Sequence, residues 1–119
     1  MPKLSTRLTR DQLNTKVVLF FNQAFTFNLV NSGTSYPESK RNEFAKNAFD
    51  TAYVILEDAY NKKDINLFNR IYSEAKRLCA GGNITEEMKQ MREEFDMKVI
   101  EFVQELKVYI ANNGHDYVR

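Results

Sequence analysis

The chain has 119 residues, a length typical of a single domain, and its 17 lysines and arginines nearly balance its 16 aspartates and glutamates. A net charge of +1 gives no whole-molecule field that would attract nucleic acid or an anionic membrane. The single cysteine excludes an internal disulfide framework, and polar residues interrupt every apolar run before it is long enough to span a bilayer. The first ten residues have no apolar core typical of a secretory signal, so we expect a cytoplasmic location.

The first predicted helix begins at a capping box and ends near Asn31. Thr9 is expected at its N-cap and Gln12 three positions later, where each side chain can bond the other's backbone. Residues 31–34, Asn-Ser-Gly-Thr, have the composition of a turn. We expect residues 1–8, before the cap, to form a flexible basic arm.

The second predicted helix begins at a second capping box in residues 35–38, Ser-Tyr-Pro-Glu, and ends near Asn61. Pro37 would lie in its first turn, where the missing N–H is harmless. Apolar residues cover about half of this helix, and Val54 alone falls on the polar side.

The third and fourth predicted helices follow short connections. Asp64 can cap a short third helix, which Gly81-Gly82 would end because glycine accepts the left-handed conformation without a clash. Thr85 can cap the fourth helix, which ends near Asn112. Apolar residues of this last helix recur mostly at alternating steps of three and four, as in a coiled-coil seam.

These elements predict an all-α fold, because short helix–helix connections favour antiparallel neighbours. The simplest architecture is an antiparallel four-helix bundle with one short helix, the third, and long N- and C-terminal helices. We expect residues 9–112 to form the single helical domain, followed by a short tail over residues 113–119.

The first helix is unusually apolar for one face of a small bundle. Its apolar residues fill an arc of about 200°, wider than one packing face requires. They are Val17, Val18, Phe20, Phe21, Ala24, Phe25, Phe27 and Leu29. Such a helix either lies at the centre of the bundle and contacts all three others, or turns part of its arc toward another subunit or a partner protein.

Helix length favours some open apolar surface. The first, second and fourth helices would span roughly 33–40 Å, whereas the third would span about 24 Å and cannot cover its neighbours from end to end. Leu19 and Val30 lie opposite the arc of the first helix, and three apolar residues of the fourth lie outside its seam. The predicted protein interface is therefore Leu19, Val30, Met97, Ile100 and Val108.

The residues of common catalytic and metal sites are scarce. Nucleophilic catalysis by a Ser-His-Asp or Cys-His arrangement would need His115, the one histidine, which lies in the C-terminal tail. Cys79 lies on the apolar stripe of the third helix, and one histidine with one cysteine cannot form a structural zinc site. We expect no enzyme, no metal and no cofactor. A carboxylate-only magnesium site is an alternative to a solvated helix face for Glu93, Glu94, Asp96, Glu101 and Glu105.

Basic residues allow a nucleic-acid alternative. Three lie before or at the start of the first helix, and three share much of the polar face of the third: Lys3, Arg7, Arg10, Arg70, Lys76 and Arg77. Base stacking is not expected there, because Phe68 and Tyr72 point inward.

The function that we predict is a non-catalytic interaction or assembly protein. The Asn, Lys, Phe and Tyr content fits AT-rich coding, a bias of many phages and mobile elements and also of many bacteria. We predict a phage- or mobile-element-encoded accessory factor or inhibitor. It would bind a larger host complex, or a second copy as a homodimer, through the first and last helices, with no membrane contact. The alternatives are a small nucleic-acid-contacting subunit, a structural virion component, and an oligomeric scavenger of a small ligand whose pocket is lined by aromatic residues.

Overall fold

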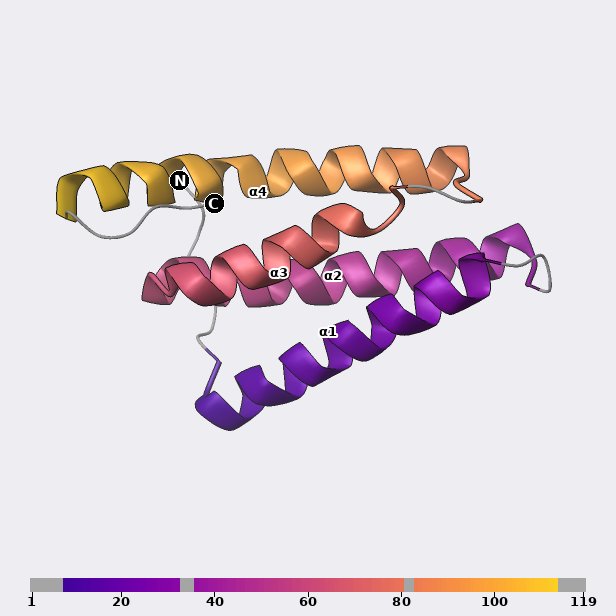
Figure 1. Cartoon of the computed structure of the whole chain (residues 1–119), viewed down its shortest axis with the longest axis horizontal. Coiled ribbons are helices and arrows are strands. Elements are labelled where there is room, and N and C mark those ends of the chain that lie inside the picture. Colours follow the sequence, from indigo (N-terminus) through magenta and orange to yellow (C-terminus); the bar gives the residue numbers. More distant parts are fainter. Residues whose placement is uncertain (1–7, 33–35, 81–82, 114–119) are drawn as a thin grey trace.

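The computed structural model describes residues 8–32, 36–80 and 83–113, and it confirms the all-α fold with a short third helix. The helices are α1 (Arg10–Asn31), α2 (Glu38–Lys62), α3 (Ile65–Arg77) and α4 (Glu86–Asn113). Successive helices run antiparallel, and α3 has 13 residues against 22, 25 and 28 in the others (Figure 1).

The central helix is α2, which packs against each of the other three. In Figure 1, α1 lies on one side of α2, α4 lies on the other, and α3 crosses between them. Of the two alternatives for the first helix, the one that places it at the centre of the bundle is therefore wrong. The physical reason is the alanine content of α2: Ala45, Ala48, Ala52 and Ala59 are fully buried, and small side chains let several helices approach one backbone closely.

The core forms around this alanine face. Phe20 and Phe27 enter it from α1, and Phe68 enters it from α3. Phe102 of α4 stacks on Tyr60 of α2 with ring centroids 4.8 Å apart. Aromatic pairs in such offset arrangements add stability beyond the area that they bury.

Three of the predicted helix starts are confirmed. The Thr9 hydroxyl accepts a bond from the Gln12 N–H, and the Gln12 side chain accepts from the Thr9 N–H, which completes the capping box. Asp64 accepts from the Leu67 N–H at 3.1 Å, and the Thr85 hydroxyl accepts from the Met88 N–H at 3.1 Å. Each cap satisfies a backbone donor that the first turn of a helix leaves unpaired.

The start of α2 and the end of α3 differ from prediction. Pro37 is the N-cap of α2 and therefore precedes its first turn instead of lying within it. The Pro37 carbonyl accepts bonds from the N–H groups of Lys40 and Arg41. Ser35, the predicted cap, lies outside the described residues. Helix α3 already ends at Arg77, and Cys79 has the positive φ of 57° that we expected from a glycine. Gly81-Gly82 also lies outside the described residues.

Candidate protein-binding surfaces

Helix α1 presents two apolar faces rather than one arc. Phe20 and Phe27 are fully buried against the core. On the opposite side of the same helix, Val18, Phe25 and Leu29 are 61%, 67% and 62% exposed. The sequence pattern places all five in a single arc, whereas the structure divides them between core and solvent. We call the exposed row of Val18, Phe25 and Leu29, with the neighbouring Asn22, the outer face of α1.

The two α1 residues predicted for an interface flank this outer face. Leu19 is 39% exposed, and Val30 is half-buried near the end of the helix. The sequence prediction therefore missed the most exposed apolar residues of α1, although their spacing of seven and four residues was a usable signal.

The outer face of α4 consists of the three residues predicted from the sequence. Met97, Ile100 and Val108 are 75%, 46% and 59% exposed. Charged and polar residues interrupt this face, among them the exposed Glu101 and Gln104. The outer face of α4 therefore offers three separate apolar side chains surrounded by charged and polar ones.

The outer faces of α1 and α4 do not form one surface. Helix α1 packs its inner face on one side of α2, and α4 packs its inner face on the other side. The two outer faces therefore point away from each other (Figure 1). A single flat partner cannot cover both at once. Two binding events, or a partner that wraps the bundle, would be needed.

A groove of about 510 Å³ runs between α2 and α4. The Phe49 and Phe95 rings form part of its wall with centroids 5.0 Å apart, and the Lys98 ammonium lies 5.6 Å from the Tyr53 ring. Burial raises the pKa of the Tyr53 hydroxyl, helped by nearby Glu57 and Glu101, so it stays a neutral hydrogen-bonding group. The groove combines an aromatic wall with both signs of charge.

Of the four tyrosines that could line a ligand pocket, only Tyr53 lines the groove between α2 and α4; the others are Tyr60, Tyr72 and Tyr109. Tyr60 is buried and its hydroxyl donates to Glu105 at 2.7 Å. Tyr72 packs on Phe68 of its own helix. Desolvation and the bond to Glu105 raise the pKa of Tyr60 to about 12.

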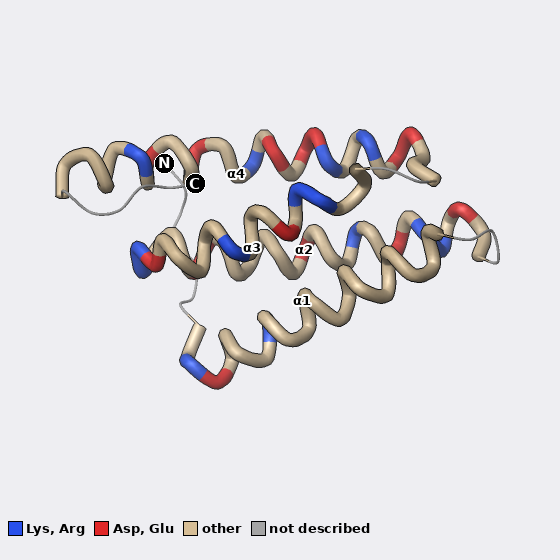
Figure 2. The backbone as a smooth tube through the Cα atoms, viewed as in Figure 1, with Lys and Arg blue, Asp and Glu red and all other residues tan. Residues whose placement is uncertain are grey.

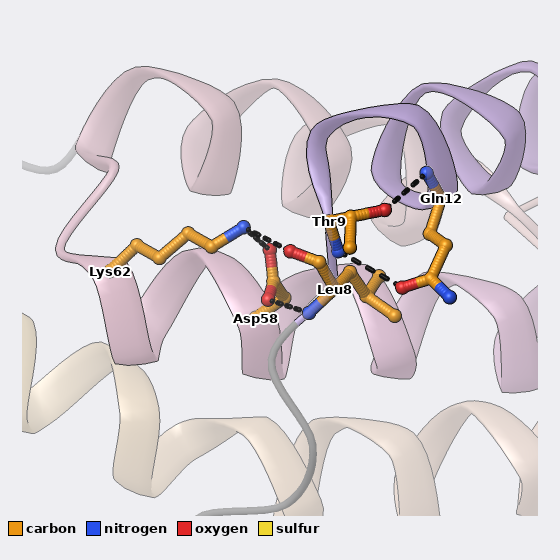
Figure 3. A network of polar contacts seen from close by, with 5 residues as sticks. All are labelled: Leu8, Thr9, Gln12, Asp58 and Lys62. Carbon is orange, nitrogen blue, oxygen red and sulfur yellow. Dashed lines mark hydrogen bonds and ion pairs between the residues drawn. The ribbon is translucent and has the colours of Figure 1, made fainter.

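A polar network fixes the start of α1 to α2 (Figure 3). The Leu8 N–H donates to the buried Asp58 carboxylate at 2.9 Å, and the Lys62 ammonium donates to the Leu8 carbonyl at 2.9 Å. Lys62 and Asp58 form an ion pair of 2.8 Å. The capping box of Thr9 and Gln12 follows directly. Leu8, which we assigned to the arm, is thus held by the helical domain.

A second polar network joins three segments at the other end of the bundle. The Arg41 guanidinium donates to the Asn31 side chain at 2.7 Å and to the Asn83 carbonyl at 2.9 Å. The Asn83 amide donates to the Asn31 carbonyl at 2.8 Å. These bonds tie the end of α1 and the segment before α4 to α2.

The predicted basic residues do not form one track. Arg70 lies 5.2 Å from the Phe21 ring of α1, and Lys76 lies 5.1 Å from the Tyr72 ring. Arg10 begins α1, whereas Lys76 and Arg77 lie in the last turn of α3, and the two helices point the same way (Figure 2). Arg10, at the start of α1, therefore lies well apart from Lys76 and Arg77 at the end of α3. Lys3 and Arg7 lie outside the described residues.

The remaining reactive groups are buried or apart. Burial raises the pKa of the Cys79 thiol to about 11, against a smaller lowering by Arg92. Among the described residues, no three His, Cys, Asp or Glu side chains come together as a metal site, and His115 is not among those residues. No helix within the described ranges is long and apolar enough to cross a membrane.

Comparison of the chain with protein-family models, with curated proteins and with solved structures finds no match.

Proposed function

We propose that this chain is a non-catalytic protein-binding module whose contact surfaces are the outer faces of α1 and α4. The observation that carries the proposal is the exposure of Val18, Phe25 and Leu29 in one row, opposite a buried row of the same helix. Exposed apolar side chains aligned on one face of a helix favour an interaction site, because burying them on a partner removes them from water.

The outer face of α4 supports a second contact with a different character. Met97 and Val108 lie among charged side chains, a combination typical of an interface that a partner of another sequence recognises. In this proposal the partner is a larger complex of the producing or host cell, and the chain acts as an accessory factor or inhibitor of phage or mobile-element origin. The composition of the chain supports that origin.

The experiment is an affinity capture from the source cell, followed by rebinding of each identified partner to purified protein. Phe25→Asp and Met97→Asp each place a charge on one outer face without touching the core. Val54→Asp is the matched control, because Val54 is an exposed apolar residue of α2 on neither face. We expect at least one outer-face variant to lose a partner that the control retains. Partners that survive both variants would refute the proposal.

A second candidate function is nucleic-acid binding through the outward side of α3. Three exposed basic residues lie there, Arg70, Lys76 and Arg77, together with one acidic residue, Glu74. Such contacts release counterions, so affinity would fall steeply with added salt. Affinity for single-stranded DNA or RNA that barely changes between low and moderate salt, or that survives Arg70→Ala with Arg77→Ala, would exclude it.

A further inference from the structure

Helix α1 carries two rows of residues with the spacing of helix-packing seams. In each row the steps alternate between four and three residues, which keeps one line of side chains facing one neighbouring helix. The inner row, packed toward the core, is Leu13, Val17, Phe20, Ala24, Phe27 and Asn31. The outer row, every member of which is exposed, is Asp11, Thr15, Val18, Asn22, Phe25 and Leu29. The outer row therefore fits a further helix, packed lengthwise on α1.

The charge pattern identifies which helix. Between Lys16 and Glu38 the sequence has no charged residue (Figure 2). The positions that flank the C-terminal part of the outer row, from Val18 to Leu29, are therefore neutral: Leu19, Phe21, Thr26 and Asn28. Charges at flanking positions normally select a partner of opposite charge and repel copies of the same helix. Here nothing opposes self-pairing, and nothing on this face would attract a charged partner.

We propose that the outer face of α1 pairs with the same face of a second copy, antiparallel, with Asn22 at the two-fold axis. The inference rests on the proposed function, in which this face is a protein contact, and it names the occupant. In this arrangement Asn22 meets the same residue of the second copy, and Val18 meets Phe25. An amide both donates and accepts, so two asparagines satisfy each other in an otherwise apolar seam and fix its register.

The direction of pairing follows from the N-terminal end of the row. A parallel pair would place Asp11 beside Asp11 and would bring like ends of the two helix dipoles together. An antiparallel pair avoids both of these repulsions. An isologous contact of this kind closes after two copies, because the same patch is used on each side.

The size of the contact predicts a weak dimer. Helix α1 spans about 33 Å, and a strip about 10 Å wide along it covers on the order of 300 Å² per copy. Stable interfaces bury roughly 1,200–2,000 Å² in total, about two to three times what this seam offers. We therefore expect dissociation in the micromolar range, and the outer face of α4 stays available to another partner.

The test is sedimentation equilibrium of the full chain over a wide concentration range. We expect the weight-average mass to rise with concentration from 13.9 kDa toward twice that value. Phe25→Asp should abolish the rise, while Met97→Asp, an equally drastic change at a more exposed apolar residue, should leave it intact. Circular dichroism of each variant establishes that it is folded.

A cysteine pair tests orientation. Mild oxidation should cross-link Asn22→Cys across the two-fold axis, whereas Val18→Cys should cross-link at least tenfold more slowly, because antiparallel pairing sets it opposite Phe25. The native Cys79 is buried and leaves this comparison undisturbed. A constant mass of 13.9 kDa, a Phe25→Asp variant that still dimerises, or faster cross-linking at Val18 would overturn the inference. A different result would overturn the dimer but leave the proposed function standing. In that result the chain is monomeric at every concentration, and Phe25→Asp still abolishes binding of a different protein.

Discussion

Asp58 and Lys62 form an ion pair of 2.8 Å in which the carboxylate is 2% exposed and the lysine side chain 32% exposed. The buried partner also accepts the Leu8 N–H, and the lysine also donates to the Leu8 carbonyl (Figure 3). One pair of side chains thus satisfies both polar groups of the residue that leads into α1. A buried carboxylate is costly unless it is paired and hydrogen-bonded, and here it is both.

We expect Asp58→Asn to destabilise the protein by about 1–3 kcal/mol, because the amide loses the ion pair and one charge-assisted bond to Leu8. Urea unfolding followed by circular dichroism measures the change. The matched control is Asp50→Asn, which removes the ion pair with Lys46, where both side chains are largely exposed. That control should cost less than about 1 kcal/mol. Equal losses in the two variants would mean that the Leu8 contacts contribute nothing.

Arg41 is expected to hold the other end of the bundle together. Arg41→Met keeps an apolar stem of similar length but removes the bonds to Asn31 and Asn83. The loss should be about 1–3 kcal/mol, because the bonded oxygens lie in a partly buried network. Lys40→Met, one residue away and in an exposed pair with Glu43, should change stability by less than about 0.5 kcal/mol. Thermal unfolding of the three proteins compares these values, and an unchanged midpoint in Arg41→Met would contradict the role assigned to Arg41.

The sequence predicts the helices well because their signals are local. Thr9, Asp64 and Thr85 cap helices where the pattern places them, since each bond joins residues only three positions apart. The end of α3 is less predictable. Cys79 takes the left-handed conformation that glycine usually takes, while its side chain remains buried in the core. Tertiary packing can outweigh local preference in this way.

The arrangement of helices and the candidate surfaces depend on long-range packing. Hydrophobic periodicity shows that Phe25 and Phe27 are both apolar, but not that α2, through Ala48 and Ala52, takes the central place and leaves Phe25 in solvent. For α4, the exposed Met97 and Val108 could be predicted, because they lie opposite a single well-defined seam. A helix with one apolar face reveals its exposed side in the sequence, whereas a helix with two such faces does not.

Two phenylalanines of α1 should therefore respond very differently to truncation. Phe27→Ala removes a ring that is 1% exposed and should cost about 3–5 kcal/mol through lost burial and a cavity. Phe25→Ala removes a ring that is 67% exposed and should change stability by less than about 0.5 kcal/mol in dilute solution. Urea unfolding at a low protein concentration separates the two. A large loss in Phe25→Ala would show that the ring is buried within one chain.

Tyr60 should make stability depend on pH at the alkaline end. Its folded pKa is raised to about 12, above the ordinary value near 10, by desolvation and by the bond to Glu105. Above pH 10 the unfolded chain releases this proton first, so the stabilisation is fully present below pH 10 and is lost as pH rises toward 12. Tyr60→Phe should lower stability by about 1 kcal/mol at pH 7 and flatten the decline over that window. Tyr36→Phe, at an exposed tyrosine, is the control, and an unaltered slope in Tyr60→Phe would contradict the assignment.

Cys79 is expected to be an unreactive thiol in the folded protein. Burial raises its pKa to about 11, an effect larger than the opposing influence of Arg92, and only the thiolate attacks disulfide reagents. At pH 8 its thiolate fraction should be about 100-fold below that of a thiol with a pKa of 9, and burial slows access further. Labelling with a chromogenic disulfide measures the rate. Val108→Cys supplies an exposed comparison thiol on α4, and denaturant should bring Cys79 to the same fast rate. Because the folded pKa is the higher one, the thiol also stabilises the fold below pH 9 and loses that contribution between pH 9 and 11. Fast labelling of native Cys79 at pH 8 would place the thiol in solvent and would contradict its position in the core.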